Sequence, residues 1–288
     1  MANGSAIIHI PVDKTSLSVN IGEFSWKASI KIGGQTTCKP KKESATVLWN
    51  CFAMGKFVAS HLRKAHYDVW TASFGNNCIE FQSRFNEARR EKAVKHPWGS
   101  NYTTTEELHV DIVDSFYADL ANPENALIED PTNAAKLKIQ DQEIWVSKKM
   151  LAAHSLFFEA LFRDKFKEGT DGIYELKEQK LEEFLQFLGI VHGLEMGVDG
   201  KTVERLMHLG DYFLAKNVLQ YCGEYLRAAH NDEVPLAKKI FLASRYNLRW
   251  AAIDLINKAS IEELKSLGST LGFSSVASSL IYEKLRLV

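Results

Sequence analysis

The chain has 288 residues, a formal net charge of -1 and a hydrophobic fraction of 45%. This length is more than one ordinary domain needs, and the composition is that of a folded chain. Acidic and basic residues are nearly balanced, which argues against a protein that binds nucleic acid or an anionic membrane surface through its overall charge.

The four cysteines, at positions 38, 51, 78 and 222, include no CxxC pair, so the sequence predicts neither a zinc knuckle nor a redox motif. The first ten residues lack the basic start and apolar core of a signal peptide. No apolar run reaches the ~20 residues that a membrane span needs. We therefore expect a cytoplasmic or nuclear protein with free thiols.

The first region, up to about Leu120, is predicted to be an antiparallel β-sandwich. Residues 24–32 alternate apolar and polar side chains, so one face of a strand would carry Phe24, Trp26, Ala28, Ile30 and Ile32. Residues 107–113 alternate in the same way. Further strands are expected at 47–54, 68–74 and 78–85, and a short helix at 86–94.

A linker is expected at residues 121–133, which hold two of the six prolines. The second region then opens with a hairpin of strands 136–139 and 143–146. Apolar residues recur at helical spacing after it. The expected elements are a helical stretch at 150–162, a strand at 172–176, and helices at 181–188, 203–214 and 218–226.

The third region, from Asn231 onward, is predicted to be entirely helical. Pro235 suits the first turn of a helix, and Ser260 with Glu263 matches a capping box. These helices are too short to be stable alone, so we expect them to pack on the domain before them.

The sequence offers little catalytic chemistry. There is no GxGxxG or HExxH motif. Gly200-Lys201-Thr202 matches the end of a phosphate-binding loop, but Glu195 replaces its first glycine, so a polar loop capped by Asp199 is the better interpretation. His154 is expected to be a buried histidine of the core, and His192 with Glu195 supplies only two metal ligands. We therefore predict no enzyme, no cofactor and no metal.

The second region resembles a BTB/POZ domain. The resemblance rests on Ile144 to Phe162, with its strand, short basic turn, LAAHS segment and aromatic-rich second helix. It continues through 166–168, 173–176 and 181–188. The sequence of this region is most similar to nematode BTB proteins, which often carry an N-terminal MATH-like domain.

This resemblance implies an α+β multidomain chain in four parts. They are a MATH-like antiparallel β-sandwich at 13–120, a linker at 121–133, an α/β BTB/POZ domain at 134–230 and a helical extension at 231–288.

The resemblance also implies a homodimer. Its interface would include Lys148, Met150, Ala153 and Phe157. The stretch from Met150 to Phe162 is more apolar than one small domain can cover, which favours an isologous contact. The alternative is that the third region covers this surface.

The resemblance further implies a role in ubiquitin ligases, because proteins similar to this one often act as substrate adaptors of cullin-RING ubiquitin ligases. The cullin-binding residues would be Phe166, Lys167 and Glu168, together with Phe162; alternatively, Phe166 only closes the core of the domain. The predicted protein is thus a dimeric, non-catalytic adaptor that binds a cullin scaffold through the BTB part and an unknown protein substrate through the N-terminal part. The alternative is a dimerising scaffold or regulatory protein without cullin binding.

One residue departs from the BTB pattern. Ala134 stands where the family usually has an aspartate that faces a basic residue across the dimer. Lys148 or Lys149 would then lack that partner. Apolar burial could still hold the dimer together, because surface ion pairs contribute little.

Overall fold

The computed structural model describes residues 4–10, 16–29, 35–61, 64–76, 78–82, 105–163, 173–267 and 272–286. The chain divides into two compact units. The first comprises Met1–Leu127 with Leu194–Gly197, and the second comprises Ile128–Gly193 with Val198–Val288.

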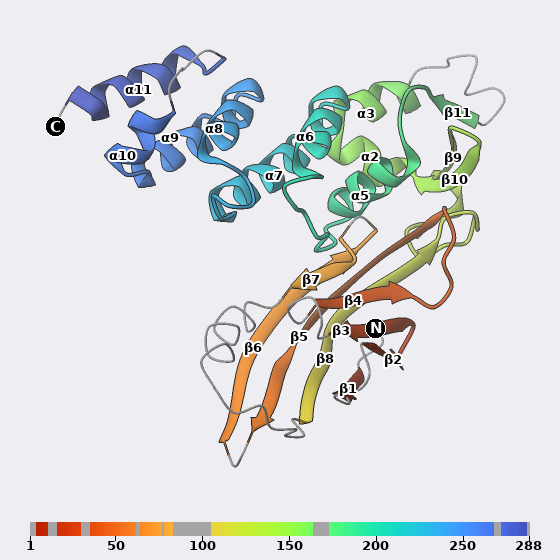
Figure 1. The fold of residues 1–288 in the computed structure, drawn as a ribbon. Helices are drawn as coiled ribbons and strands as arrows, with labels where there is room; N and C mark the ends of the chain where they lie inside the picture. Colours follow the sequence, from red (N-terminus) through yellow and green to blue (C-terminus); the bar gives the residue numbers. More distant parts are fainter. Residues whose placement is uncertain are drawn as a thin grey trace. The chain divides into compact units, whose positions relative to one another are not determined.

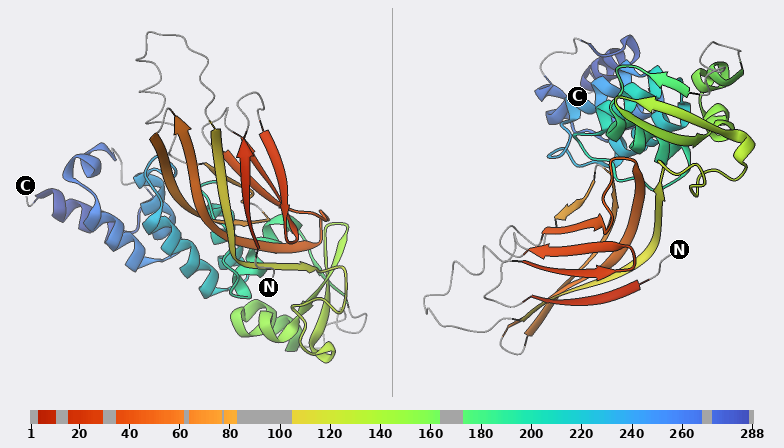
Figure 2. Two further views of the ribbon diagram at one scale, coloured as in Figure 1. Left: turned by 90° about the horizontal axis from the view of Figure 1, so that it is seen from below. Right: turned by 90° about the vertical axis from the view of Figure 1, so that its right-hand side faces the viewer.

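The first unit contains two four-stranded antiparallel sheets (Figures 1 and 2). The first sheet has the strand order β1-β8-β5-β6, with β1 at Gly4–Ile10, β8 at Thr105–Asp119, β5 at Val47–His61 and β6 at Lys64–Gly75. The second sheet has the order β2-β3-β4-β7, with β2 at Ser16–Ile21, β3 at Phe24–Ser29, β4 at Gln35–Pro40 and β7 at Glu80–Gln82.

The core of this unit lies between the two sheets. Trp26 of β3 is fully buried, and its ring meets Phe74 of β6 edge-on at a centroid distance of 5.1 Å. The rings of Phe24 and Trp49 make a tilted contact at a centroid distance of 5.6 Å. Alternation places these side chains inward from each strand, so the predicted apolar faces at Phe24, Trp26 and Ala28 and at 108, 110 and 112 are confirmed.

The strands differ from expectation mainly in number and length. β1, β2 and β4 were not predicted. β5 and β8 are about twice as long as the strands predicted at 47–54 and 107–113. Of the strand predicted at 78–85, Glu80–Gln82 form β7, and residues 83–85 lie outside the described residues. Ile30, Ile32 and the helix predicted at 86–94 lie outside the described residues.

The second unit begins with a mixed three-stranded sheet of order β10-β9-β11. The strands are β9 at Ala134–Ile139, β10 at Gln142–Ser147 and β11 at Ile173–Leu176. The hairpin β9–β10 is antiparallel, as predicted, while β11 runs parallel to β9. A short 3-10 turn, η1 at Pro131–Asn133, leads into the sheet.

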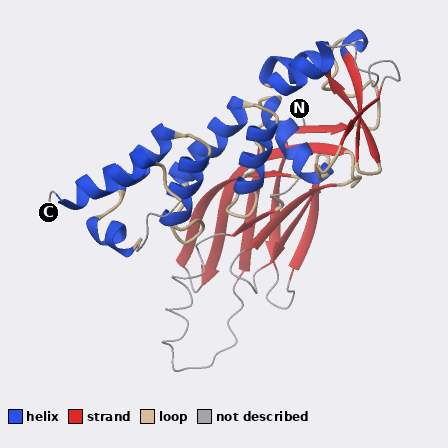
Figure 3. Cartoon of the chain, turned by 90° about the horizontal axis from the view of Figure 1, so that it is seen from above, coloured by secondary structure: helices blue, strands red, loops and turns tan. Residues whose placement is uncertain are grey.

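Short helices make up the rest of this unit (Figure 3). They are α2 at Lys148–His154, α3 at Leu156–Arg163, α5 at Leu181–Val191, α6 at Val203–Tyr212, α7 at Lys216–Ala228, α8 at Leu236–Arg245, α9 at Arg249–Lys258, α10 at Ile261–Ser266 and α11 at Ser275–Arg286. The predicted fold class, an α+β chain with an N-terminal antiparallel sandwich and a helical C-terminal region, is confirmed. The four-part division of the chain stays a prediction.

The C-terminal helices pack on α7, as expected. The ring of Trp250 on α9 lies so close to Gly223 of α7 that an added Cβ would be 2.7 Å from it. The Arg227 side chain also donates a hydrogen bond to Asp254 of α9 at 2.7 Å. The predicted capping box at Ser260 and Glu263 is present at the start of α10. Pro235 stands one position before α8, at its N-cap, and not in its first turn.

Candidate functional site

The helical stretch predicted at 150–162 is two helices, α2 and α3, separated by Ser155. The backbone of Ser155 is extended, with φ -143° and ψ 117°. Its hydroxyl accepts a hydrogen bond from the Phe158 amide at 3.1 Å and donates one to the Phe213 carbonyl at 2.5 Å. One buried side chain therefore caps the start of α3 and ties it to the end of α6.

An aromatic cluster fills the space beside this break. Phe158 is fully buried, and its ring lies 4.9 Å from Phe213, 5.7 Å from Phe162 and 6.1 Å from Phe184, measured between centroids. Phe187 also meets Phe213 at 5.1 Å. Three segments of the chain, α3, α5 and the end of α6, thus contribute to one core, and Phe158 is at its centre.

Part of the apolar surface next to this cluster is open to solvent. Leu156 is 57% exposed, Tyr212 49% and Leu214 53%. The half-buried ring of Phe157 lies 5.8 Å from that of Tyr212, which joins α3 to the end of α6. We call Leu156, Phe157, Tyr212 and Leu214 the α3–α6 patch. Clustered exposed apolar side chains of this kind are typical of protein interaction surfaces.

The backbone conformation of Leu214 is unfavourable for a leucine, which supports a functional role for its exposed side chain. The Ala215 amide bonds to the Gly210 carbonyl and the Leu214 amide to the Asp211 carbonyl, so α6 ends in a Schellman motif. Leu214 occupies the left-handed position, with φ 52°. Two other helices reach the same conformation after their last turn, but through Gly193 and Asn247, which tolerate it. An exposed leucine here costs about 1 kcal/mol relative to glycine.

Of the four predicted dimer residues, Phe157 belongs to the α3–α6 patch, and the interface role of all four stays a prediction. Ala153 is exposed, while Lys148, Met150 and Phe157 are partly buried. The structure brings Phe157 together with the α3–α6 patch. Sequence periodicity had not identified Leu156, Tyr212 or Leu214 as interface candidates. The exposure of Leu156 also shows that the C-terminal helices do not cover this surface, which was the alternative considered.

The basic residues at the start of α2 have an acidic neighbour in the same unit. Hydrogen bonds from Thr132 lower the pKa of Asp130, and the charge of Lys149 lowers it further. Ala134 itself pairs with Ser147 across the β9–β10 hairpin. Lys149 is therefore near a carboxylate even though Ala134 replaces the usual aspartate.

The predicted cullin-binding residues are only partly within the described structure. Phe162 is half-buried, and its ring stacks on Phe158 and meets Tyr174 of β11 edge-on at 5.1 Å. Phe166, Lys167 and Glu168 lie outside the described residues. Their role stays a prediction.

Of the two histidines considered in the sequence, His154 differs from expectation. His154 is exposed, so the prediction of a buried core histidine was wrong: it closes the last turn of α2. His192 follows α5, and its Nε2 atom is buried without a hydrogen-bond partner. Burial lowers the pKa of His192 to about 4, and the charge of His154 acts in the same direction.

We expect the stability of the second unit to fall as the pH drops from about 6.5 to about 4. In this range the unfolded chain binds a proton at His192 and the folded chain does not, so protonation favours unfolding. The loss from His192 should be about 2 kcal/mol at pH 4.5 relative to pH 7. Urea unfolding at both values measures it. Between pH 7 and pH 4.5, His192→Asn should lose less stability than the parent protein. His208→Asn, at an exposed site on α6, is the control and should behave as the parent. Equal losses in all three proteins would exclude His192 as the cause.

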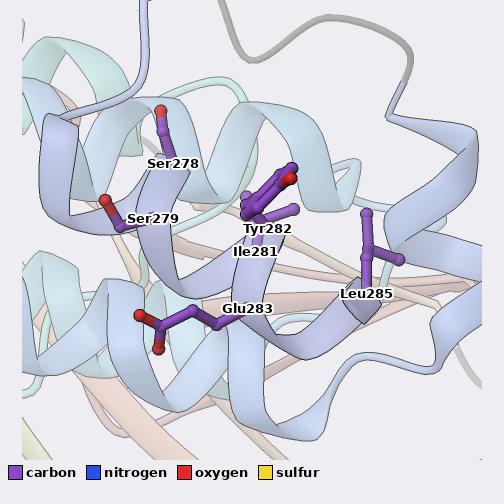
Figure 4. Close-up of a pocket in the computed structure, with 6 residues that line it drawn as sticks. All are labelled: Ser278, Ser279, Ile281, Tyr282, Glu283 and Leu285. Atoms are coloured by element: carbon purple, nitrogen blue, oxygen red, sulfur yellow. The ribbon is translucent and has the colours of Figure 1, made fainter. Parts of the chain in front are cut away.

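A depression of about 450 Å³ is lined by described residues of α11 alone, including Ser278, Ser279, Tyr282 and Glu283 (Figure 4). Among the described residues, no three His, Cys, Asp or Glu side chains are grouped so that they could hold a metal ion. In the same part of the chain, no helix combines the length and apolar character required to cross a bilayer.

The second unit has the features of a protein-interaction module. It combines a mixed sheet that begins with a hairpin, an aromatic core and an exposed apolar patch. Residues 133–230 match the BTB/POZ domain family. The chain is 27% identical to "BTB and MATH domain-containing protein 38" of Caenorhabditis elegans over 142 residues, which are 49% of this chain and 36% of the relative. It is also 27% identical over 124 residues to protein 15 of that series, covering 42% of this chain and 44% of the relative.

The chain therefore carries a BTB/POZ domain and is homologous to nematode BTB and MATH domain-containing proteins. This confirms the predicted resemblance. The matches span less than half the length of these relatives.

Proposed function

We propose that this protein is a non-catalytic adaptor that dimerises through its BTB/POZ domain and recruits a target protein to a cullin-RING ubiquitin ligase. The observation that carries the dimer is the α3–α6 patch, which stays exposed in a single copy of the chain. A two-fold axis through this patch would bury the same residues from both copies.

The target is assigned to the N-terminal unit. The outer face of its first sheet exposes Ile7, Met54, Tyr67, Val69 and Val113, with exposed fractions between 46% and 72%. Lys56 adds a positive charge to the same face, because it pairs with Val69 of β6. A dimer presents two such surfaces and so raises the effective concentration of the target at the ligase.

The cullin is assigned to Phe166, Lys167 and Glu168, which follow α3 in the sequence. An aromatic anchor and a carboxylate acceptor can supply most of the binding energy of a small interface. The assignment is supported by the BTB/POZ match and by the place of these residues within it.

A pull-down with purified cullin tests this proposal. The intact protein should retain the cullin, and the double variant Phe166→Ala with Glu168→Ala should lose at least about 30-fold in affinity. Lys265→Ala with Glu262→Ala, on the exposed side of α10, is the matched control and should bind as the parent. Absence of binding by the parent, or full binding by the double variant, would reject the cullin role and leave a dimerising scaffold.

A further inference from the structure

Two of the four cysteines face each other inside the N-terminal sandwich. Cys38 lies on β4 of the second sheet and Cys51 on β5 of the first sheet, and both side chains are completely buried in the same core. Within its own sheet, Cys38 pairs with Trp26 and Cys51 pairs with Phe74. Since the rings of Trp26 and Phe74 touch across the core, the two thiols lie in one layer of the sandwich.

The packing around these thiols allows the sheets to approach. On one side of the pair, the next inward positions are Thr36 on β4 and Ala53 on β5, both small and both fully buried, while Pro40 and Trp49 are the inward positions on the other side. Facing sheets are usually about 10 Å apart, and a disulfide needs its two Cα atoms within roughly 7 Å. Small neighbours lower the cost of that approach. Hydrogen bonding between the two thiols is consistent with this arrangement.

Burial makes the same thiols unreactive in the folded chain. It is the main reason that the pKa of Cys38 is raised, so the thiol and not the nucleophilic thiolate is present at neutral pH. Exchange with a soluble disulfide therefore requires the sandwich to be open, as it is before folding is complete.

We propose that Cys38 and Cys51 are a modification site, where an intersheet disulfide forms if the N-terminal unit folds in the presence of a low-molecular-weight disulfide such as glutathione disulfide. This inference rests on the fold alone and is independent of the adaptor role.

The chemistry is ordinary thiol–disulfide exchange. One cysteine thiolate attacks a glutathione disulfide, forming a protein–glutathione mixed disulfide and releasing one glutathione. The second thiolate attacks the protein sulfur of that mixed disulfide and releases another glutathione. Two cysteine thiols are oxidised, one glutathione disulfide is reduced to two glutathione molecules, and the two protons pass to the released thiols.

The product should be more stable than the dithiol form. The bond closes the segment 39–50 in the unfolded chain, which removes conformational freedom that unfolding would regain. The sheets gain a covalent link that stays buried after folding, so reduction also requires opening. The stability of the folded unit would then depend on whether the chain had folded under oxidising or reducing conditions.

The test is refolding of the full-length chain from urea, in glutathione alone or with glutathione disulfide, followed by alkylation and peptide mapping. Oxidative refolding should yield a Cys38–Cys51 peptide and raise the melting temperature of the first unit by roughly 10 °C, reversed by a reductant under denaturing conditions. Folded reduced protein in the same buffer should form the bond at least about 10-fold more slowly.

Two variants separate this pair from the other cysteines. Cys78→Ala with Cys222→Ala should retain the full increase in melting temperature, because Cys222 belongs to α7 and Cys78 is only partly buried. Cys38→Ala should abolish the increase in melting temperature. Mapping of the unmodified chain decides the matter even if a variant does not fold: alkylation of both Cys38 and Cys51 after oxidative refolding, or linkage of either one to Cys78, overturns the proposal.

Discussion

Phe158→Ala should lower the free energy of unfolding of the second unit by about 3–5 kcal/mol. Phe158 is fully buried and its ring meets those of Phe162, Phe184 and Phe213, so truncation leaves a cavity bounded by several segments. Those rings come from separate helices that cannot all move inward. Urea unfolding of the full-length chain, monitored by far-UV circular dichroism, measures the loss.

Two controls define this prediction. Phe158→Leu keeps most of the volume and should cost less than about 1.5 kcal/mol. Tyr282→Ala removes an aromatic ring that is 69% exposed on α11, so it should change stability by no more than about 0.5 kcal/mol. A cost for Phe158→Ala below 1 kcal/mol would show that Phe158 is not the centre of the core.

If the proposed dimer forms through the α3–α6 patch, Leu156→Asp should convert it to a monomer, with a rise in the dissociation constant of at least about 100-fold. The change places a charge in the middle of the α3–α6 patch, where association would desolvate it. The fold should tolerate it, because Leu156 is the first residue of α3 and an acidic side chain is favourable at a helix N-terminus. Sedimentation equilibrium over a range of concentrations gives the constant.

A second variant separates association from folding. Leu214→Gly removes the left-handed strain of a leucine and should raise the free energy of unfolding by about 1 kcal/mol at a protein concentration where both forms are monomeric. It should also weaken the dimer, because it deletes an exposed side chain of the patch. Tyr282→Asp, on a distant surface of the same unit, should leave the dimer intact. A parent protein that remains monomeric at high concentration contradicts the proposed dimer.

Much of the fold could be predicted because it depends on local periodicity. Alternation at 24–28 and 108–112 identified the inward faces of β3 and β8, and the hairpin β9–β10 followed from two short apolar runs around a polar turn. The strands that were missed are short or mixed in character. β4 has the polar Thr36 at a buried position and Thr37 and Lys39 between its buried positions, so its pattern is weak until Thr36, Cys38 and Pro40 are known to face the core.

The sequence by itself therefore determined the sandwich, the helical C-terminal region and the BTB/POZ resemblance, since spacing along one strand or helix is a property of neighbouring residues. Only the tertiary structure decided which surface stays exposed. Leu156 and Leu214 are far apart in the chain, and they become neighbours because Ser155 bonds to the Phe213 carbonyl. The facing of Cys38 and Cys51 was likewise decided by the packing of two sheets, a contact that no periodicity along a single strand can reveal.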